Sequence, residues 1–266
     1  MFNGPVITRY QEVPVTHLPG EADGLRVAHI SDLHFRRFDL TAMQAQAHLL
    51  ELDYDLLVCT GDIGDRPERT ERTAELCRRF FEPLAARTRC LVVTGNHDSS
   101  ELAGVLDIPV TFLLNDWISV RVGSGRIVVA GLDQAGGQYG DIDRALSGIP
   151  PGSTVVLLAH YPSTIYRVTD ERVRAVLSGH THGGQIRLPF IGCVWAQDEI
   201  PVRMARGLHI VHGRSLHVTA GIGVATPIRL RFLCPPEIVV LTLRRASGTA
   251  EAERPPCEAA LVEVRE

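Results

Sequence analysis

Short apolar runs rich in Val, Ile and Leu recur along the chain and break off at Gly, Asp, Asn or His. Runs of this length, bounded abruptly, are typical of buried strands. Between the early runs, Leu40–Leu52 and Glu68–Leu84 carry apolar residues at helical spacing, with helix caps expected at Asp39 and at the Asp65–Pro67 turn. The predicted strands are Leu25–Ile30, Leu56–Cys59, Cys90–Thr94, Val155–Ala159 and Ala175–Ser178.

The order of these elements predicts the fold class. Strands alternate with helices in the early part, which indicates βαβ units and a mainly parallel sheet. Later, Trp117–Val122 and Arg126–Ala130 flank Gly123-Ser124-Gly125, and Ile210–Val211 and Leu216–Ala220 flank another Gly-containing turn, as in β-hairpins. We therefore expect an α/β domain in which two mixed β-sheets pack face to face and helices cover them outside.

Length and composition favour a single domain over residues 1–245. A chain of 266 residues is within the size, roughly 250–300 residues, to which one core keeps growing. Its 45% hydrophobic and 22% charged residues are those of an ordinary globular protein. Residues 246–266, rich in Ala, Glu and Pro, offer little apolar surface to bury and are predicted to be a flexible tail.

Charge and cysteine content exclude several classes of function. The net charge of −4 gives no broad attraction for nucleic acid, so no nucleic-acid partner is predicted, and only a local basic patch could bind an anion. All 27 basic residues are Arg, which excludes a catalytic lysine. The cysteines form no CxxC pair, which indicates neither a zinc ribbon nor a disulfide framework. No signal-peptide-like or membrane-spanning run is seen, and a cytoplasmic protein is predicted.

Polar clusters rich in Asp, His and Asn stand where predicted strands end, the edge at which open α/β sheets bind ligands. A glycine precedes three of them, and a residue without Cβ allows a sharp turn there. Two divalent ions about 3.5–4 Å apart need one anionic oxygen that reaches both, completed by His nitrogens and carboxylate or amide oxygens. One such cluster alone would be an ordinary solvated turn, but the ordered set supplies all these donors. The clusters are Asp32-Leu33-His34, Gly61-Asp62-Ile63-Gly64-Asp65, Gly95-Asn96-His97-Asp98, His160 and Gly179-His180-Thr181-His182.

The ordered series DxH, GDxxD, GNHD, H and GHxH resembles the signature of the calcineurin-like metallophosphoesterase superfamily. The run from Ser178 to Gln185, with Gly221-Ile-Gly223, Pro227-Ile-Arg229 and Pro235-Pro-Glu237, is similar to the bacterial phosphodiesterase branch of the YkuE and YaeI type. This resemblance implies a four-layer αββα sandwich and a metal-dependent phosphoric ester hydrolase in which metal-activated hydroxide attacks phosphorus in line. We expect a phosphodiesterase. The alternatives are a phosphomonoesterase or nucleotide-sugar pyrophosphatase on the same core, and a non-catalytic scaffold.

The resemblance also implies a role for each residue. Asp62 would bridge two metal ions, and His97 would be the general acid beside the leaving group without binding metal. Asp65 and Asp98 would be neighbouring carboxylates that orient ligand imidazoles. A nitrogen and oxygen ligand set suits divalent or trivalent Mn, Fe, Zn or Co, among which the sequence does not choose. The other ligands would be Asp32, His34 and His182 for the first ion, and Asn96, His160 and His180 for the second.

Some residues outside the metal set have two interpretations. Arg229 would contact the substrate phosphate bidentately or form a surface ion pair. The apolar segment Ile186–Trp195 would be core or sheet-edge packing, or an apolar lip in which Trp195 contacts an organic group of the substrate. Histidines outside the motifs are expected to be structural or at the surface, with His212 the readiest exception because it lies near the C-terminal glycines; the others are His17, His29, His48, His209 and His217.

Overall fold

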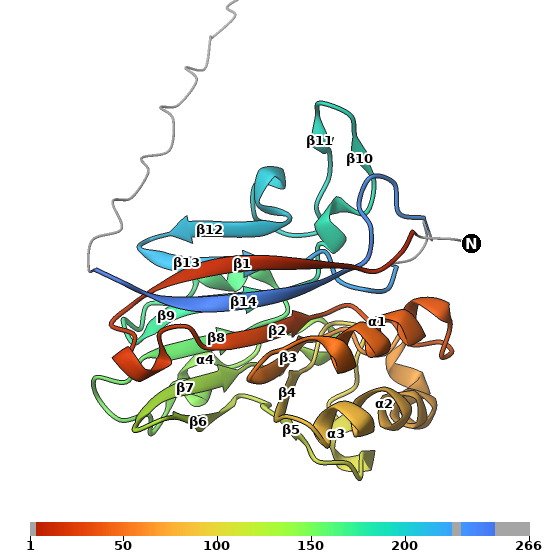
Figure 1. Ribbon diagram of the computed structural model, residues 1–266. Helices are drawn as coiled ribbons and strands as arrows, with labels where there is room; N and C mark the ends of the chain where they lie inside the picture. Colours follow the sequence, from red (N-terminus) through yellow and green to blue (C-terminus); the bar gives the residue numbers. More distant parts are fainter. Residues whose placement is uncertain (1–3, 225–229, 248–266) are drawn as a thin grey trace, which may run out of the picture.

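The computed structural model describes residues 4–224 and 230–247, and two six-stranded mixed sheets form its centre (Figure 1). The strand order is β1-β14-β2-β3-β4-β5 in the first sheet and β12-β13-β9-β8-β7-β6 in the second. Buried side chains of the two inner faces, such as Val58, Leu91, Val129 and Leu177, fill the space between the sheets. The predicted α/β sandwich is confirmed.

The first sheet contains the predicted βαβ units. Strands β2 to β5 are parallel neighbours, and the helices that connect them cover the outer face of the sheet. The helices are α1 (Leu40–Glu51), α2 (Thr70–Ala85) and α3 (Leu102–Val105). The strands are β1 (Ile7–Thr16), β2 (Arg26–Ile30), β3 (Leu56–Thr60), β4 (Cys90–Val93), β5 (Val110–Phe112) and β14 (Glu237–Ala246).

The second sheet contains both predicted hairpins. Strand β6 pairs antiparallel with β7, and β12 pairs antiparallel with β13, while β7, β8, β9 and β13 are parallel. The layer on its outer face is thin, because α4 (Ile142–Leu146) and the 3-10 turns Pro162–Tyr166 and Val202–Met204 are short. The strands are β6 (Asp116–Val122), β7 (Gly125–Gly131), β8 (Val155–Leu158), β9 (Val173–Ser178), β12 (Gly207–Val211) and β13 (Arg214–Val218).

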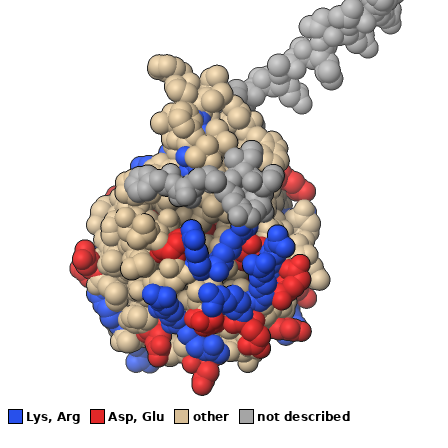
Figure 2. Space-filling view, turned by 90° about the vertical axis from the view of Figure 1, so that its right-hand side faces the viewer, with Lys and Arg blue, Asp and Glu red and all other residues tan. Residues whose placement is uncertain are grey.

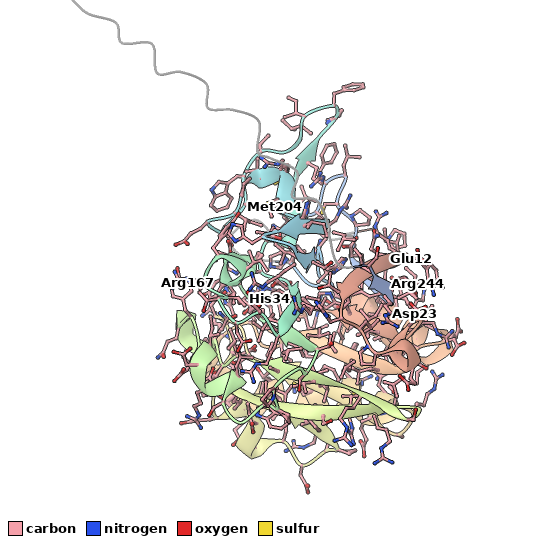
Figure 3. The ribbon with its side chains drawn as sticks, turned by 90° about the vertical axis from the view of Figure 1, so that its left-hand side faces the viewer. Glu12, Asp23, His34, Arg167, Met204 and Arg244 are labelled. Carbon is pink, nitrogen blue, oxygen red and sulfur yellow. The ribbon has the colours of Figure 1, made fainter. Side chains whose placement is uncertain are left out.

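The sequence pattern did not predict β1, a strand of ten residues that contains Pro14. Proline has no N–H to donate and is therefore confined to sheet edges, and β1 is the edge strand beside β14. Polar contacts between segments far apart in the sequence line this edge (Figure 3). Arg244 donates to the Glu12 carboxylate at 2.8 Å, and the Arg245 amide donates to the Asp23 carboxylate at 2.9 Å.

One of the two predicted helix caps is confirmed. The Asp39 carboxylate accepts a hydrogen bond from the Ala42 amide at 3.1 Å, as an N-cap does. The predicted cap at Asp65–Pro67 is wrong, because a 3-10 turn (Pro67–Arg69) intervenes and α2 begins at Thr70 without a side-chain cap. The Asp65 carboxylate pairs with Arg36 instead.

Residues 248–266, which hold most of the predicted tail, and residues 225–229, which include Arg229, lie outside the described residues. The domain boundary at residue 245 and the cytoplasmic location stay predictions. The five cysteines in the described part of the chain are free and buried. Within residues 4–224 and 230–247, no helix combines the length and the apolar character that crossing a membrane requires.

Candidate metal centre

All of the proposed metal ligands lie in loops that follow the carboxyl ends of strands. The loops after β2, β3 and β4 come from the first sheet, and those after β8 and β9 from the second. Neighbouring parallel strands place such loops at one edge of a sheet, and the facing sheets bring the two edges together. The loops carry Asp32 and His34, Asp62, Asn96, His160, and His180 with His182, in that order.

Several of these residues have an unusual backbone conformation. Asp32, His34, Asp62, His180 and His182 have φ between 45° and 69°. Residues with a side chain rarely adopt this left-handed region, and each costs of the order of 1–3 kcal/mol unless the surroundings enforce it. Strain of this kind concentrates where function requires a particular side-chain direction.

Gly95 and Gly179 allow the loops to approach closely. A Cβ at Gly95 would overlap the Asp62 carboxylate and lie 2.8 Å from His160 Nδ1. A Cβ at Gly179 would overlap the Ser31 side chain and lie 2.5 Å from an Asp32 carboxylate oxygen. Both positions therefore require glycine, because a side chain would have no space beside the site.

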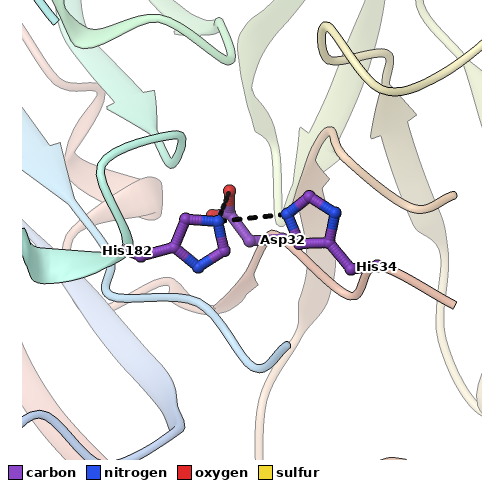
Figure 4. A group of neighbouring side chains, drawn as sticks. All are labelled: Asp32, His34 and His182. Atoms are coloured by element: carbon purple, nitrogen blue, oxygen red, sulfur yellow. Dashed lines mark hydrogen bonds and ion pairs between the residues drawn. The ribbon is translucent and has the colours of Figure 1, made fainter. Parts of the chain in front are cut away.

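The first group of possible ligands is Asp32, His34 and His182, which are all buried (Figure 4). The Nε2 atoms of the two histidines are 3.0 Å apart, and His182 Nε2 is 3.5 Å from Asp32 Oδ1. Burial lowers the pKa of His34 to about 4 and raises the pKa of Asp32 to about 6. The ring of His34 is therefore neutral at neutral pH, and one of its nitrogens has a lone pair to offer.

The second group is Asp62, His160 and His180. His160 Nδ1 lies 2.8 Å from the Thr60 carbonyl oxygen, and His180 Nε2 lies 2.5 Å from the Gln197 carbonyl oxygen. A carbonyl oxygen only accepts, so these two ring nitrogens carry the protons. The other nitrogens, His160 Nε2 and His180 Nδ1, face each other at 3.1 Å. Burial lowers the pKa of His160, but the attraction of Asp62 and Asp32 outweighs it and raises this pKa to about 9, so the site favours a positive charge at His160. The group therefore fits a metal ion, which would take the place of that proton.

Asp62 belongs to the second group and also reaches the first. Its Oδ2 atom is 3.5 Å from His34 Nε2 and 3.3 Å from His160 Nε2, and its Oδ1 atom accepts a hydrogen bond from the His97 amide at 2.9 Å. Burial opposes ionisation of Asp62, but the surrounding imidazoles of His160, His34 and His97 together outweigh it and keep the Asp62 pKa well below its usual value. Asn96 Oδ1 is 3.1 Å from His160 Nε2 and adds a neutral oxygen to the second group.

His97 lies at the rim of both groups and is only half-buried. Its Nδ1 donates to the Asp65 carbonyl oxygen at 3.1 Å, which leaves Nε2 as the nitrogen that can exchange a proton. The ring centroids of His97 and His34 are 5.0 Å apart. One ring nitrogen of His97 also falls within 4.8 Å of ligand atoms of His34 and Asp62, so these three residues form a third group of possible metal ligands.

Asp98 and Asp65 do not make the contacts that sequence reasoning gave them. The Asp98 carboxylate accepts hydrogen bonds from the amides of Ile63, Gly64 and Gly95 at 2.7–3.2 Å, and so joins the loops after β3 and β4. The Asp65 carboxylate pairs with Arg36. Backbone carbonyls, rather than these carboxylates, orient the imidazoles of the second group.

Arg231 was missed by sequence reasoning because it belongs to no motif. It is buried, and its Nη2 atom donates to the carbonyl oxygens of Ala220 and Gly223 at 2.7 and 2.5 Å. The same Nη2 lies 3.4 Å from His182 Nδ1, which places a cation behind the first group. An Arg between Leu230 and Phe232 was the only signal in the sequence.

Gln134 was also missed. Its side chain is fully buried in the loop after β7, and Oε1 accepts hydrogen bonds from the amides of His160 and Tyr161 at 2.6 and 3.1 Å. It thereby fixes the backbone of a proposed ligand from the neighbouring loop. A lone Gln in an Asp-Gln-Ala sequence gives no pattern from which this contact can be predicted.

Gln134→Leu is expected to destabilise the fold and weaken metal binding. The change removes the acceptor of two amides, and an unpaired buried amide costs about 1–3 kcal/mol. Thermal unfolding and metal titration measure the two effects. Gln11→Leu, at a half-buried position on β1 whose side chain donates to the neighbouring Glu12 carbonyl, is the control and should change neither. Equal behaviour of the two variants would show that Gln134 does not position His160.

The remaining predicted residues lie apart from the metal groups. His212 is exposed, with its ring 6.1 Å from that of Tyr166, and His29 pairs with His217 in the interior at 3.0 Å between Nδ1 atoms. Trp195 is 64% exposed in the loop after β11 (Gly192–Cys193). Its carbonyl would lie 3.4 Å from a Cβ at Gly184, which places the Trp195 backbone beside the loop of His182.

Residues 25–184, which contain every proposed metal ligand, match the family model described as calcineurin-like phosphoesterase. The chain belongs to the calcineurin-like phosphoesterase family. The metallophosphoesterase YkuE of Bacillus subtilis is 30% identical over 85% of this chain and 82% of its own length. The phosphodiesterase YaeI of Escherichia coli is 27% identical over 82% of each chain.

A third relative carries a more specific name. The UDP-2,3-diacylglucosamine pyrophosphatase LpxG of Chlamydia trachomatis is 28% identical over 82% of this chain and 83% of its own. The family and these relatives show that the protein is a metallophosphoesterase, a hydrolase that acts on phosphate esters. The resemblance found in the sequence is confirmed, and the donor groups in the structure agree with metal binding.

Proposed function

We propose that this metallophosphoesterase is a phosphodiesterase with a binuclear metal centre. The observation that carries the proposal is the position of Asp62, whose Oδ2 atom lies within 3.5 Å of a nitrogen in each of the two donor groups. One carboxylate that reaches both groups is what a pair of ions requires. Asp32, His34 and His182 would hold one ion, and Asn96, His160 and His180 the other. Mn, Fe, Zn or Co suit these donors.

The residues around the donor groups divide the chemical work. Two bound ions would activate water for in-line attack and polarise the phosphoryl oxygens. His97, with Nδ1 donating to the Asp65 carbonyl, would give a proton from Nε2 to the departing oxygen. The hydrogen bond from its own amide to Asp62 Oδ1 ties the acid to the bridging carboxylate, so His97 keeps a fixed place relative to both groups.

Trp195 supports a diester as the substrate. Its ring is mostly exposed, and Gln197, two residues further on, accepts the hydrogen bond from His180. An apolar ring at the rim stabilises an organic substituent by roughly 25 cal/mol per Å² buried, and offers nothing to a strongly hydrated monoester dianion. The name of YaeI agrees with a diesterase. The 28% identity to LpxG makes a nucleotide-sugar pyrophosphatase the second candidate.

With Mn²⁺ bound, kcat/KM is expected to be higher for bis-p-nitrophenyl phosphate than for p-nitrophenyl phosphate. Trp195→Ala should lower the diester value selectively, because only the diester has a second group to bury. Steady-state hydrolysis of both esters provides the measurement. Tyr10→Ala, which removes another exposed aromatic ring on edge strand β1, is the control. A higher kcat/KM for the monoester would refute the proposal that the enzyme is a phosphodiesterase. An unchanged ratio of the two kcat/KM values in Trp195→Ala would refute only the proposed contact between Trp195 and the substrate.

A further inference from the structure

A small hairpin of β10 (Arg187–Leu188) and β11 rises from the body of the protein (Figure 1). It is joined to a second segment by two hydrogen bonds, from Arg187 N to Phe232 O at 2.9 Å and from Phe232 N to Gln185 O at 3.0 Å. We call residues 188–195 and 230–233 together the apolar projection. Side chains at its tip point away from the body (Figure 3).

The apolar projection exposes large hydrophobic side chains from both of its segments. Phe190 is 110% exposed, so its ring packs against nothing. Scattered apolar side chains at a surface are normal, but a contiguous group on one raised element indicates an interaction site. The exposed members are Leu188, Phe190, Ile191, Val194, Trp195, Leu230, Phe232 and Leu233.

Arginines, interspersed with acidic side chains, lie on the face of the molecule below the projecting part (Figure 2). All basic residues of the chain are Arg, so every blue side chain in that view is a guanidinium. Arg36 and Arg37 line a cavity of about 410 Å³ beside His34, and Arg66 lies in a smaller hollow beside His97. Arg37 and Arg66 are exposed. Arg36 pairs with Asp65, and Arg66 Nε lies 3.9 Å from Asp65 Oδ2, so Arg37 and Arg66 are the two exposed guanidinium groups of these cavities beside the metal centre.

The projection is attached directly to the metal centre at both ends. His182 and the turn that follows it lead into β10, and the chain that leaves β11 reaches Gln197, whose carbonyl accepts the hydrogen bond from His180. The base of the projection therefore lies beside the metal centre.

We propose that the apolar projection inserts into the interfacial layer of an anionic lipid bilayer while Arg37 and Arg66 contact its phosphates, and that the metal centre takes an amphiphilic phosphodiester from that layer. Exposed Trp and Phe rings beside basic groups suit this interface, where each basic residue adds about 1 kcal/mol. The proposed amphiphilic substrate rests on the proposed function, whereas the proposed docking to a bilayer does not.

The shape of the projection favours a bilayer over a second copy of the chain. Stable protein interfaces bury about 1,200–2,000 Å² between complementary surfaces. The projection is a narrow hairpin whose tip ring, Phe190, packs against nothing in the described part of the chain. A bilayer requires no such complementarity, and the bordering arginines are matched by anionic headgroups.

Cosedimentation of the full chain with vesicles tests the docking. We expect binding to mixed phosphatidylcholine and phosphatidylglycerol vesicles, and much weaker binding to phosphatidylcholine alone. The double variant Phe190→Ser with Ile191→Ser should reduce binding about tenfold or more, because it removes the apolar tip. Arg37→Gln with Arg66→Gln should reduce binding about 30-fold, because two basic residues at the membrane surface contribute about 2 kcal/mol and every 1.4 kcal/mol is a factor of ten. Tyr10→Ser, an exposed aromatic position on β1, should bind as the unaltered chain does.

Several results would overturn the docking surface. They are failure to bind mixed vesicles, full binding by the tip double variant, equal binding to both kinds of vesicle, and a dimer in sedimentation velocity that the tip variant abolishes. Hydrolysis of soluble bis-p-nitrophenyl phosphate keeps the two proposals distinguishable. The tip variant should hydrolyse it normally, whereas a chain that binds vesicles but hydrolyses no diester would refute the proposed function alone.

Discussion

Asp62→Asn is expected to lose bound metal and turnover together. Among the described residues, the Asp62 carboxylate is the group with an oxygen within 3.5 Å of nitrogens in both donor groups, and the amide oxygen that replaces it carries no charge to hold two cations. A loss of several kcal/mol of transition-state stabilisation corresponds to roughly 10³-fold or more in kcat. Elemental analysis of the purified variant and its rate of diester hydrolysis measure the two effects.

Asp53→Asn is a suitable control for this experiment. Asp53 is an exposed carboxylate that pairs with Arg26 at the surface, and an exposed pair contributes little. The control should keep its metal and its rate. An Asp62→Asn enzyme with full activity and two ions per chain would show that Asp62 does not bridge the ions.

His97→Ala is expected to retain metal and lose roughly 10²–10⁴-fold in kcat, the usual contribution of a positioned acid or base. His97 is half-buried, and one of its ring nitrogens is held by the Asp65 carbonyl, so the remaining nitrogen suits proton transfer. The loss should be smaller for an ester with a good leaving group, because such a group departs with little help from a proton. Hydrolysis of a series of aryl esters measures this dependence.

The matched comparison is His180→Ala, which removes a nitrogen of the second donor group. This variant should lose metal, because His180 Nδ1 is 3.1 Å from His160 Nε2 and its other nitrogen is fixed by the Gln197 carbonyl. Elemental analysis of both variants separates the two roles. If His97→Ala loses as much metal as His180→Ala, then His97 is a ligand, as its nearness to His34 and Asp62 also allows.

The elements that local pattern predicts are those formed by neighbouring residues. The βαβ units and both hairpins were predicted because each joins segments that follow one another in the chain. Strand β1 was missed, because the strand that it pairs with is β14, more than 200 residues later in the chain. Pairing between such distant segments leaves no local periodicity to find.

For the metal centre, the sequence itself determined the chemistry. The types, order and glycine spacing of the clusters predicted the family and the set of donors, since side-chain nitrogen and carboxylate atoms are specified by residue identity. Their arrangement was decided only by the tertiary structure. It placed Asp62 within reach of both groups and gave five of the proposed ligands a positive φ. It also placed the Thr60 and Gln197 carbonyls where they orient two imidazoles. Every residue has a backbone carbonyl, so the sequence does not show which carbonyl accepts a hydrogen bond from a given imidazole.

Exposure is the other property that the fold alone decided. The run Ile186–Trp195 was compatible with core or sheet-edge packing and with a lip, because apolar composition is the same in both. In the structure, Cys193 is buried while Phe190, Ile191 and Trp195 face solvent on the apolar projection. Whether an apolar side chain is covered depends on segments distant in the sequence, such as the one around Phe232 that pairs with the base of the hairpin. The sequence therefore determined the reaction class and supplied the candidate donors, and the tertiary structure decided the surface that surrounds them.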